Sequence, residues 1–416
     1  MSYQLDASAT PVAGLTSQGV AVTLTETANG DGSFTYEATA GTEAVFTLIV
    51  NTDGSYNFTL EGPIDHAVDS DELTLNFPII ATDFDGDTSA ETIPVKIVDD
   101  KPTLGGIEAT SVQTVDEDDI PTVGSDGTQS NSIAGNFIAT DGSDGIVEYG
   151  VSDLTTPVQG LTSGGQSLVM VEVSNAGGVS VYEARIDGTT TPVFRVTLDA
   201  SDDSYTFDLL ALLDHPNADG QNELIINLPI NATDFDGDVS NNITLPITVV
   251  DDVPTIDGLL AGSEQTVDED DLPAGTDAAS AEDTVISGTF DITEGADQVA
   301  SIQLSDLTTP VASLTSDGEA ITLVLSSSAN GVNVYQGVAG NPAEVVFELT
   351  LDATNNSYEF DLQKPLDHPD GNQQNEIVIN LPVTATDNDG DTSPAFTLPI
   401  TVCLLYTSPS PRDTRE

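Results

Sequence analysis

The chain has 416 residues, and its 70 acidic residues against 7 Lys plus Arg give it a formal charge of −63 at pH 7. Phosphate backbones and anionic membrane surfaces are recognised through basic patches, so this charge excludes nucleic acid and argues against membrane-surface binding. A single cysteine, Cys403, excludes an internal disulfide, and no apolar run is long enough for direct insertion into a membrane.

The composition favours strands and turns. Thr, Val, Ile, Asp and Gly are abundant, whereas helix-forming residues are scarce. The apolar residues, 38% of the chain, come in short bursts, which suit several small cores better than one large core.

Internal repeats divide the chain. ATDFDGD begins at Ala81 and at Ala232, and ATDNDGD begins at Ala385, at intervals of about 150 residues. The segments SDLTTPV, QTVDEDD and VDD-x-PT recur at the same offset. These matches predict a truncated repeat 1 at 1–100, a complete repeat 2 at 101–252 and a repeat 3 at 253–402.

Two hairpins recur within each repeat. In repeat 1, VFTLIV and SYNFTL flank the turn NTDG, and the same hairpin is expected in repeat 2 at 193–209. A second hairpin is expected at 224–250. We predict eight to ten strands per repeat, no helix, and an all-β fold of tandem antiparallel β-sandwiches, immunoglobulin- or cadherin-like, in an elongated array. Prolines within the strands, such as Pro229 and Pro246, predict edge strands or bulges.

The most informative motif is Asp-x-Asp-Gly-Asp. It provides three carboxylates at alternate positions around a glycine that allows a sharp turn, and hard cations such as Ca²⁺ bind six to eight oxygens. The alternative is that Asp and Gly only form a turn. Ca²⁺ is favoured over zinc because the candidate ligands are oxygens and each repeat has a single His. The predicted ligands are Asp83, Asp85, Asp87, Asp234, Asp236, Asp238, Asp387, Asp389 and Asp391.

A second acidic group ends each repeat, at Asp99 and Asp100 and at Asp251 and Asp252. Eight residues of strand span about 26 Å, so this pair and the Asp-x-Asp-Gly-Asp loop lie at opposite poles of a repeat. We therefore expect each pair to meet the loop of the next repeat, within about 10 Å, and to bind Ca²⁺ there. The VDEDD segments at 115–119 and 267–271 are either further ligands or solvated charge runs.

The histidines give little indication of an enzyme. His66, His215 and His368 each follow an Asp, and an identical active site repeated three times along a chain is implausible. We expect Asp-His to cap a turn before the following strand, and we predict no catalytic residues.

Residues 403–416, CLLYTSPSPRDTRE, break the repeat pattern and contain the sole Cys and two of the four Arg. This change of pattern and composition indicates a non-native tail derived from a sequencing adapter. We expect the natural protein to continue beyond Val402 and to begin before Met1.

The repeat length, ATDFDGD, LPITVVDD-x-PT and QTVDEDD together resemble the repeats of giant bacterial adhesins of the RTX type, exported by type I secretion. The resemblance covers 1–402. It implies a secreted or bacterial cell-surface protein whose repeats fold in external Ca²⁺ and act as extenders that support adhesion and biofilm formation. It also implies export without an N-terminal signal peptide, in keeping with the polar start SYQLDASATP. The expected partners are Ca²⁺ and neighbouring repeats, and the adhesive target is unknown. The alternative is a calcium-dependent ligand- or carbohydrate-binding module.

Overall fold

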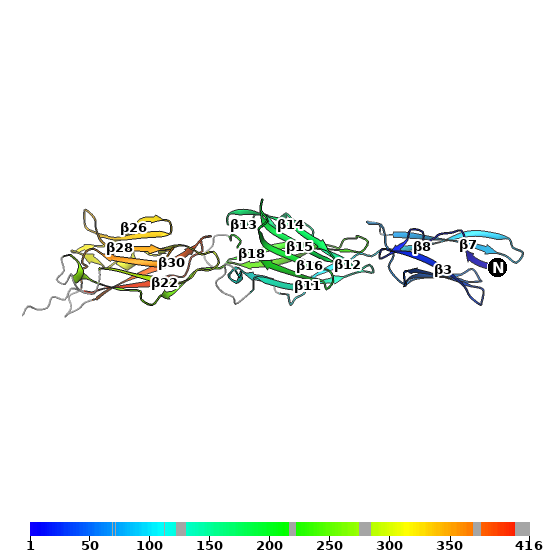
Figure 1. Ribbon diagram of the computed structural model, residues 1–416, viewed down its shortest axis with the longest axis horizontal. Helices are drawn as coiled ribbons and strands as arrows, with labels where there is room; N and C mark the ends of the chain where they lie inside the picture. The colour runs from blue at the N-terminus through cyan, green and yellow to red at the C-terminus, as the bar shows by residue number, and fades with distance from the viewer. Residues whose placement is uncertain are drawn as a thin grey trace, which may run out of the picture.

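Three β-sandwiches follow one another along the long axis of the molecule, one within each predicted repeat (Figure 1). The computed structural model describes residues 1–68, 70, 72–111, 113–121, 130–215, 222–273, 284–368 and 376–403. The predicted tail lies outside these residues except for Cys403, which ends the last strand. No helix of the described residues is long and apolar enough to cross a membrane.

Repeat 1 contains a sheet with the order β1-β7-β8 and a sheet with the order β2-β3-β4-β5-β6. The strands are β1 (Ser2–Leu5), β2 (Thr16–Ser17), β3 (Val20–Ala28), β4 (Phe34–Ala40), β5 (Glu43–Val50), β6 (Tyr56–Leu60), β7 (Glu72–Thr82) and β8 (Thr88–Val98).

Repeat 2 pairs a sheet of order β10-β19-β18-β12 with one of order β13-β14-β15-β16-β17-β11-β9. The strands are β9 (Thr103–Ile107), β10 (Thr114–Asp116), β11 (Ser132–Thr140), β12 (Ile146–Val151), β13 (Thr162–Ser163), β14 (Gln166–Ala176), β15 (Val179–Ile186), β16 (Pro192–Asp199), β17 (Ser204–Leu209), β18 (Glu223–Asp234) and β19 (Ile243–Val250). The described part of this repeat thus has eleven strands, more than predicted, because short edge pairings add to the long strands.

Repeat 3 repeats this arrangement in sheets of order β21-β31-β30-β23 and β20-β22-β29-β28-β27-β26, with a separate β24-β25 pair. The strands are β20 (Thr255–Leu259), β21 (Thr266–Asp268), β22 (Val285–Thr293), β23 (Val299–Leu304), β24 (Thr315–Ser316), β25 (Glu319–Ala320), β26 (Thr322–Ala329), β27 (Val332–Ala339), β28 (Glu344–Asp352), β29 (Ser357–Leu362), β30 (Glu376–Asp387) and β31 (Phe396–Cys403).

Each sandwich has its own hydrophobic core. Alternate residues of the strands point inward, as Phe207, Leu228 and Val196 do in repeat 2, and all three are fully buried. Burying a side chain of this size contributes about 1.5–3 kcal/mol. The predicted all-β tandem sandwich is confirmed. Helical structure in the described residues is limited to four three-residue 3₁₀ turns, η1 (Glu117–Asp119), η2 (Thr156–Val158), η3 (Glu269–Asp271) and η4 (Thr309–Val311).

One short pairing in each of repeats 2 and 3 is parallel, whereas the other named pairings are antiparallel. β10 leaves the sheet of β9, crosses to the other sheet and runs beside β19, with Asp116 opposite Val250. As a result η1, which follows β10, lies next to the acidic pair that follows β19. The VDEDD segment is therefore built into the end of the sandwich.

The prediction that prolines mark edge strands is wrong for β18 and β19, which are internal in their sheet. The carbonyl of Pro229 accepts from Ser152 N (2.9 Å), the residue after β12 ends. Thr248 N donates to Gln113 O (2.7 Å), the residue just before β10 begins. Pro246 lies two residues earlier in β19, so its nitrogen points to the same side of the strand at a position that β10 does not reach. Proline is tolerated because the adjacent strands are too short to require its missing N–H.

Gly288 on β22 lies opposite Tyr358 on β29, and a Cβ there would stand 2.5 Å from the tyrosine ring. Tyr358 Oη donates to Glu264 O (2.5 Å), which holds the ring in place. Gly288→Ala is therefore expected to destabilise repeat 3 by about 1–3 kcal/mol, measured by thermal unfolding in saturating Ca²⁺. Gly30→Ala, with nothing within 4 Å of the new Cβ, serves as the control. Equal effects of both substitutions would contradict the packing argument.

Candidate metal centres

The Asp-x-Asp-Gly-Asp loops form closed turns. Asp234 ends β18, and its Oδ1 accepts from Gly237 N (3.1 Å) and Asp238 N (2.7 Å). Asp234 N donates to Asp238 O (3.1 Å), and Gly237 has a φ of 104°, which favours glycine. The first carboxylate thus shapes the turn through one oxygen. Turn formation and metal binding are compatible, because the turn uses only Oδ1 of Asp234 and the other carboxylate oxygens of the loop remain available to an ion.

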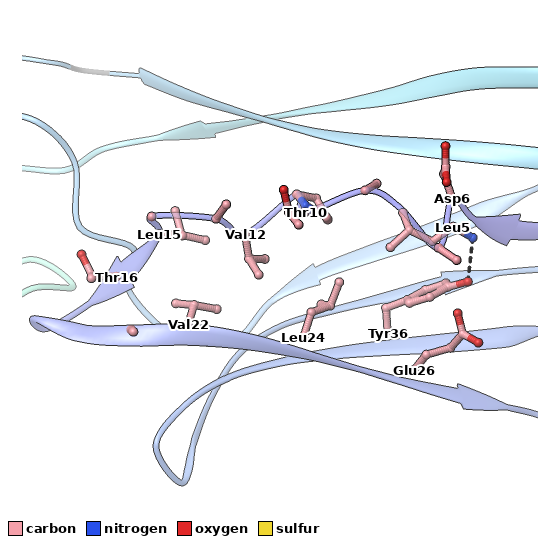
Figure 2. A pocket seen from close by; sticks show the side chains of 16 residues that line it. Leu5, Asp6, Thr10, Val12, Leu15, Thr16, Val22, Leu24, Glu26 and Tyr36 are labelled. Atoms are coloured by element: carbon pink, nitrogen blue, oxygen red, sulfur yellow. Dashed lines mark hydrogen bonds between the residues drawn. The ribbon is translucent and has the colours of Figure 1, made fainter.

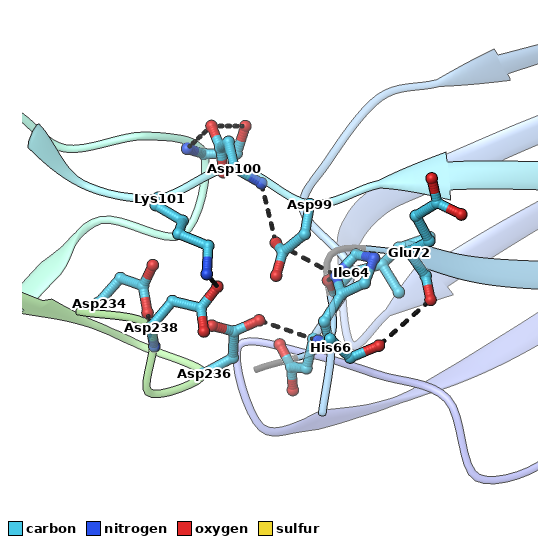
Figure 3. Close-up of polar contacts among 12 residues, drawn as sticks. Ile64, His66, Glu72, Asp99, Asp100, Lys101, Asp234, Asp236 and Asp238 are labelled. Atoms are coloured by element: carbon cyan, nitrogen blue, oxygen red, sulfur yellow. Dashed lines mark hydrogen bonds and ion pairs between the residues drawn. The ribbon is translucent and has the colours of Figure 1, made fainter. Parts of the chain in front are cut away.

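The loop of repeat 2 meets the end of repeat 1 at what we call junction 1 (Figure 3). Asp236 Oδ2 accepts from His66 N (2.9 Å), and His66 Nδ1 lies 3.3 Å from Asp99 Oδ1. One ligand atom from each of these three residues lies within 4.8 Å of the others. Lys101 Nζ lies 3.3 Å from Asp238 Oδ2. The sequence-based expectation that Asp99 approaches the Asp234–Asp238 loop therefore holds in the structure.

Asp100 faces a different part of junction 1. Its Oδ2 accepts from Ser143 N (2.9 Å) and Ser143 Oγ (3.2 Å), and its carboxylate groups with those of Asp99 and Asp144. Asp144 lies here because Ile146 of β12 pairs with Asp234 of β18. It is buried, although its sequence context gave no indication of a site.

Apolar contacts also cross junction 1. A Cβ on Gly19 would stand 3.2 Å from the Phe235 ring, and one on Gly237 would stand 3.1 Å from a Val68 methyl group. Phe84, the equivalent of Phe235 in repeat 1, is fully exposed. Contact with the preceding repeat thus covers this aromatic position in part, since Phe235 remains 43% exposed.

Junction 2 joins repeats 2 and 3 in the same way, with deeper burial. Asp251 and Asp252 follow β19 and are both fully buried, and the carboxyl group of Asp391 lies beside that of Asp251. Asp252 Oδ2 accepts from Ala296 N, and Asn388 Nδ2 donates to Asp297 O (2.6 Å). Asp251 has therefore met the 387–391 loop, as predicted, whereas Asp252 contacts the neighbouring segment at Ala296.

Glu117 completes junction 2 from within repeat 2. Its Oε1 accepts from Leu213 N (2.8 Å), and its carboxylate groups with those of Asp251, Asp252 and Asp297. Glu117 is the central residue of a VDEDD segment, so that part of the segment is a buried member of the cluster and not a solvated charge run.

The Asp of each Asp-His pair caps a turn, but a different one from that expected. Asp214 accepts from Gly164 N (2.7 Å) and Gly165 N (2.8 Å), the turn of the β13–β14 hairpin, and Asp65 does the same at Gln18 and Gly19. Both turn residues of each hairpin have positive φ, which leaves their N–H groups facing the carboxylate. Consequently the next residue, His66 or His215, points into the junction and not into the cap.

Burial raises the pKa values of the junction carboxyl groups. Desolvation, followed by nearby acids, raises the pKa of Asp144 to about 7, of Asp387 to about 7 and of Asp297 to about 8. For Asp251, desolvation and then the neighbouring Asp391 carboxyl group raise the pKa to about 10. Junction 2 therefore resists ionisation of its acids unless another positive charge is supplied.

Buried carboxylate oxygens without a hydrogen-bond partner among the described residues mark both junctions. They are Asp99 Oδ2, Asp144 Oδ1 and Asp236 Oδ1 at junction 1, and Glu117 Oε2, Asp251 Oδ2, Asp252 Oδ1, Asp297 Oδ2, Asp387 Oδ2, Asp389 Oδ1 and Asp391 Oδ1 at junction 2. Buried acceptors of this kind normally have partners. An all-oxygen set of this size fits a hard divalent cation such as Ca²⁺.

The loop of repeat 1 provides an internal comparison. Asp83, Asp85 and Asp87 also lie within 4.8 Å of one another, yet Asp85 and Asp87 are exposed. Hydrogen bonding, chiefly from the Asp85 side chain, lowers the pKa of Asp83, the opposite of the shift at Asp234, where desolvation raises the pKa to about 6. The loop conformation is thus intrinsic, whereas burial comes from the neighbouring repeat.

A search of protein-family models matches residues 112–245 and 264–397, each within one predicted repeat, to the family described as Domain of unknown function (DUF5801). The chain belongs to this family. No curated protein matches it.

Solved structures with some similarity to this DUF5801 chain include the D00-D0 domain of intimin, at 13% identity, 71% of this chain, 98% of that chain and a TM-score of 0.19. Drosophila N-cadherin EC1-3 is 14% identical over 86% of this chain and 85% of that chain, with a TM-score of 0.22. Chicken CNTN1 FN1-FN3 is 10% identical over 91% of this chain and 97% of that chain, with a TM-score of 0.19. TM-scores this low do not indicate a function.

An open groove in repeat 1 contrasts with the junctions of the DUF5801 chain (Figure 2). It has a volume of about 520 Å³ and is lined mainly by apolar side chains such as Val12, Leu24 and Tyr36. Tyr36 Oη accepts from Leu5 N (2.7 Å), and Leu304 N donates to Tyr335 Oη (3.1 Å) at the equivalent place in repeat 3. The tyrosine therefore anchors a strand, and the charged chemistry of the chain lies at the junctions.

In chelator, the free energy of unfolding is expected to fall as pH rises from about 4 to about 8. A raised pKa means that the folded chain holds the proton more tightly than the unfolded chain. This stabilisation is complete below pH 3.8, the ordinary pKa of an Asp carboxyl group. It is lost as the pH rises through the folded-state pKa values, which are about 7 for Asp387 and about 8 for Asp297. Saturating Ca²⁺ should weaken or reverse the trend, because it binds ionised carboxylates. Thermal unfolding across this pH range tests this.

The matched variants for the pH experiment are Asp297→Asn, which should flatten the fall in chelator, and Asp202→Asn, in an exposed hairpin turn, which should not. A chelator-treated chain that becomes more stable as pH rises would contradict the buried-acid argument.

Lys101 distinguishes the two junctions. It pairs with Asp238 at junction 1, whereas Val253 occupies the corresponding position after Asp252 at junction 2. Lys101→Val should make junction 1 more dependent on Ca²⁺. Val253→Lys should lower the Ca²⁺ affinity of junction 2 by roughly tenfold, if the added ammonium group competes with the ion by about 1.4 kcal/mol. Calorimetric Ca²⁺ titration of the full chain measures both. Unchanged binding in both variants would show that the ammonium group does not compete with an ion.

Proposed function

We propose that Ca²⁺ binds at both junctions and stiffens the chain, which serves as an extender segment of a secreted or cell-surface adhesin. The observation that supports this most strongly is the convergence of buried carboxylates from successive repeats at each junction.

Electrostatics supplies the mechanism. Two like charges about 4 Å apart repel by about 1 kcal/mol in water and about 4 kcal/mol at an effective surface dielectric. Ionised acids from adjacent repeats would thus push the repeats apart. A divalent cation between them turns this repulsion into attraction that links one repeat to the next, so bending the junction would break metal–oxygen contacts.

The oxygens available to Ca²⁺ come from both sides of each junction. At junction 1 they belong to Asp99, Asp100, Asp144, Asp234, Asp236 and Asp238, and at junction 2 to Glu117, Asp251, Asp252, Asp297, Asp387, Asp389 and Asp391. The preceding strand ends supply Asp99 and Asp251, so an ion bound to them and to the next loop holds two rigid sandwiches.

An elongated array of cores with metal-held junctions suits a spacer that keeps a binding domain away from a cell surface (Figure 1). The motif resemblance to RTX-type adhesins adds type I secretion, folding in external Ca²⁺ and a role in adhesion and biofilm formation to the proposal. The acidic composition agrees with this, because repulsion among like charges destabilises the compact state until cations neutralise them.

Removing Ca²⁺ should lower the unfolding midpoint and make the array flexible. Sites with dissociation constants of roughly 10⁻⁴–10⁻³ M contribute on the order of 1 kcal/mol each in millimolar Ca²⁺. Small-angle X-ray scattering of the full chain in Ca²⁺ and in chelator should show a loss of rigid extension.

Asp236→Ala should produce part of this loss in Ca²⁺, whereas Asp202→Ala, which alters only the exposed turn between β16 and β17, should not. A chain equally straight and stable in chelator would overturn the proposal.

A further inference from the structure

The three histidines are the only ones in the chain, and two of them lie at the junctions. The His215 side chain is fully buried, and neither ring nitrogen has a hydrogen-bond partner among the described residues. The side chain of His66 is 3% exposed, and its Nε2 likewise has no partner there. Burying imidazole nitrogens without partners costs free energy, so these positions call for a ligand.

At junction 1 the His66 ring is oriented by its other nitrogen. Nδ1 lies 2.8 Å from Ile64 O and 3.3 Å from Asp99 Oδ1, so the ring lies against the carboxylate that ends repeat 1. One atom each of His66, Asp99 and Asp236 lies within 4.8 Å of the others, so the ring can share an ion with both carboxylates.

At junction 2 the His215 ring lies between two buried acids. Nε2 is 3.6 Å from Glu117 Oε1, and Nδ1 is 4.0 Å from Asp251 Oδ2. One atom from each of these three residues lies within 4.8 Å of the others, and all three residues are buried. The spacing leaves room for an ion in contact with nitrogen and oxygen.

The ligand set differs from that of the Ca²⁺ positions. Calcium selects oxygen ligands, whereas imidazole combined with carboxylate suits zinc and related divalent transition metals. One histidine alone is too few for such a site, but carboxylates add to it: Asp236 from the next repeat at junction 1, and Glu117 and Asp251 from the same repeat as His215 at junction 2.

We propose that each junction holds, beside Ca²⁺, one divalent transition-metal ion of the Zn²⁺ class, bound by His66 with Asp99 and Asp236 at junction 1 and by His215 with Glu117 and Asp251 at junction 2. These carboxylates also belong to the Ca²⁺ positions. At junction 1 Asp236 comes from the next repeat, so the second ion adds to the cross-link between repeats. At junction 2 all three ligands belong to repeat 2, so the second ion orders the acids that meet repeat 3. The array thereby responds to two metals.

The test is calorimetric titration of the full chain with Zn²⁺ in a large excess of Ca²⁺. The expected result is two Zn²⁺ ions per chain, falling to one in His66→Gln, to one in His215→Gln and to none in the double variant. His368→Gln is the matched control and should retain both ions, because Leu404 follows β31 where repeat 2 has Asp251.

X-ray absorption at the zinc edge of the unaltered protein provides a readout that needs no variant. Imidazole scattering is expected from one or more of the three histidines, and the titration of His368→Gln separates His368 from the two junction histidines. Zn²⁺ binding that is the same in the double variant, that disappears in excess Ca²⁺, or that lacks imidazole scattering would overturn the inference. Calcium-dependent extension of the double variant, measured by scattering, tests the proposed function separately.

Discussion

The structure depends on the placement of ionisable acids where solvent is excluded and other acids are close. Asp251 and Asp252 are fully buried at junction 2 together with Glu117, and burial raises the pKa values of Asp251 to about 10 and Asp252 to about 6. Such a cluster is unfavourable when ionised and unpaired. In the proposed function a bound cation removes this cost, and because Asp297 of repeat 3 belongs to the same cluster, the ion would also fix the angle between the two repeats.

The sandwiches position these acids through strand pairing. β12 against β18, and β23 against β30, place Asp144 and Asp297 beside the loops. The parallel run of β10 along β19 places Glu117 next to Asp251. Each core thus acts as a rigid support, and the chemistry lies on the loops at its poles.

The two junctions are built alike but are not equivalent. Lys101 supplies one positive charge at junction 1, and Asp100 is exposed there, whereas the corresponding Asp252 is buried at junction 2. In the described residues, junction 2 also gains Glu117 from its own repeat. Junction 2 therefore concentrates more buried acidic groups, and in the proposed function it would depend more strongly on bound cations.

Repeat spacing, alternation and turn residues were enough to predict tandem all-β sandwiches, because side-chain periodicity and glycine conformation are local properties that a sequence displays directly. The polarity of a sandwich even predicted that Asp99 and Asp251 would meet the next Asp-x-Asp-Gly-Asp loop. Ligand assignments remain predictions. The roles of His66, His215, Asp144 and Asp297 escaped sequence reasoning, although their recurrence at the repeat interval was a signal. These residues join the clusters only through pairing between distant strands and contact between repeats, and such burial is a property of the folded array and not of any local pattern.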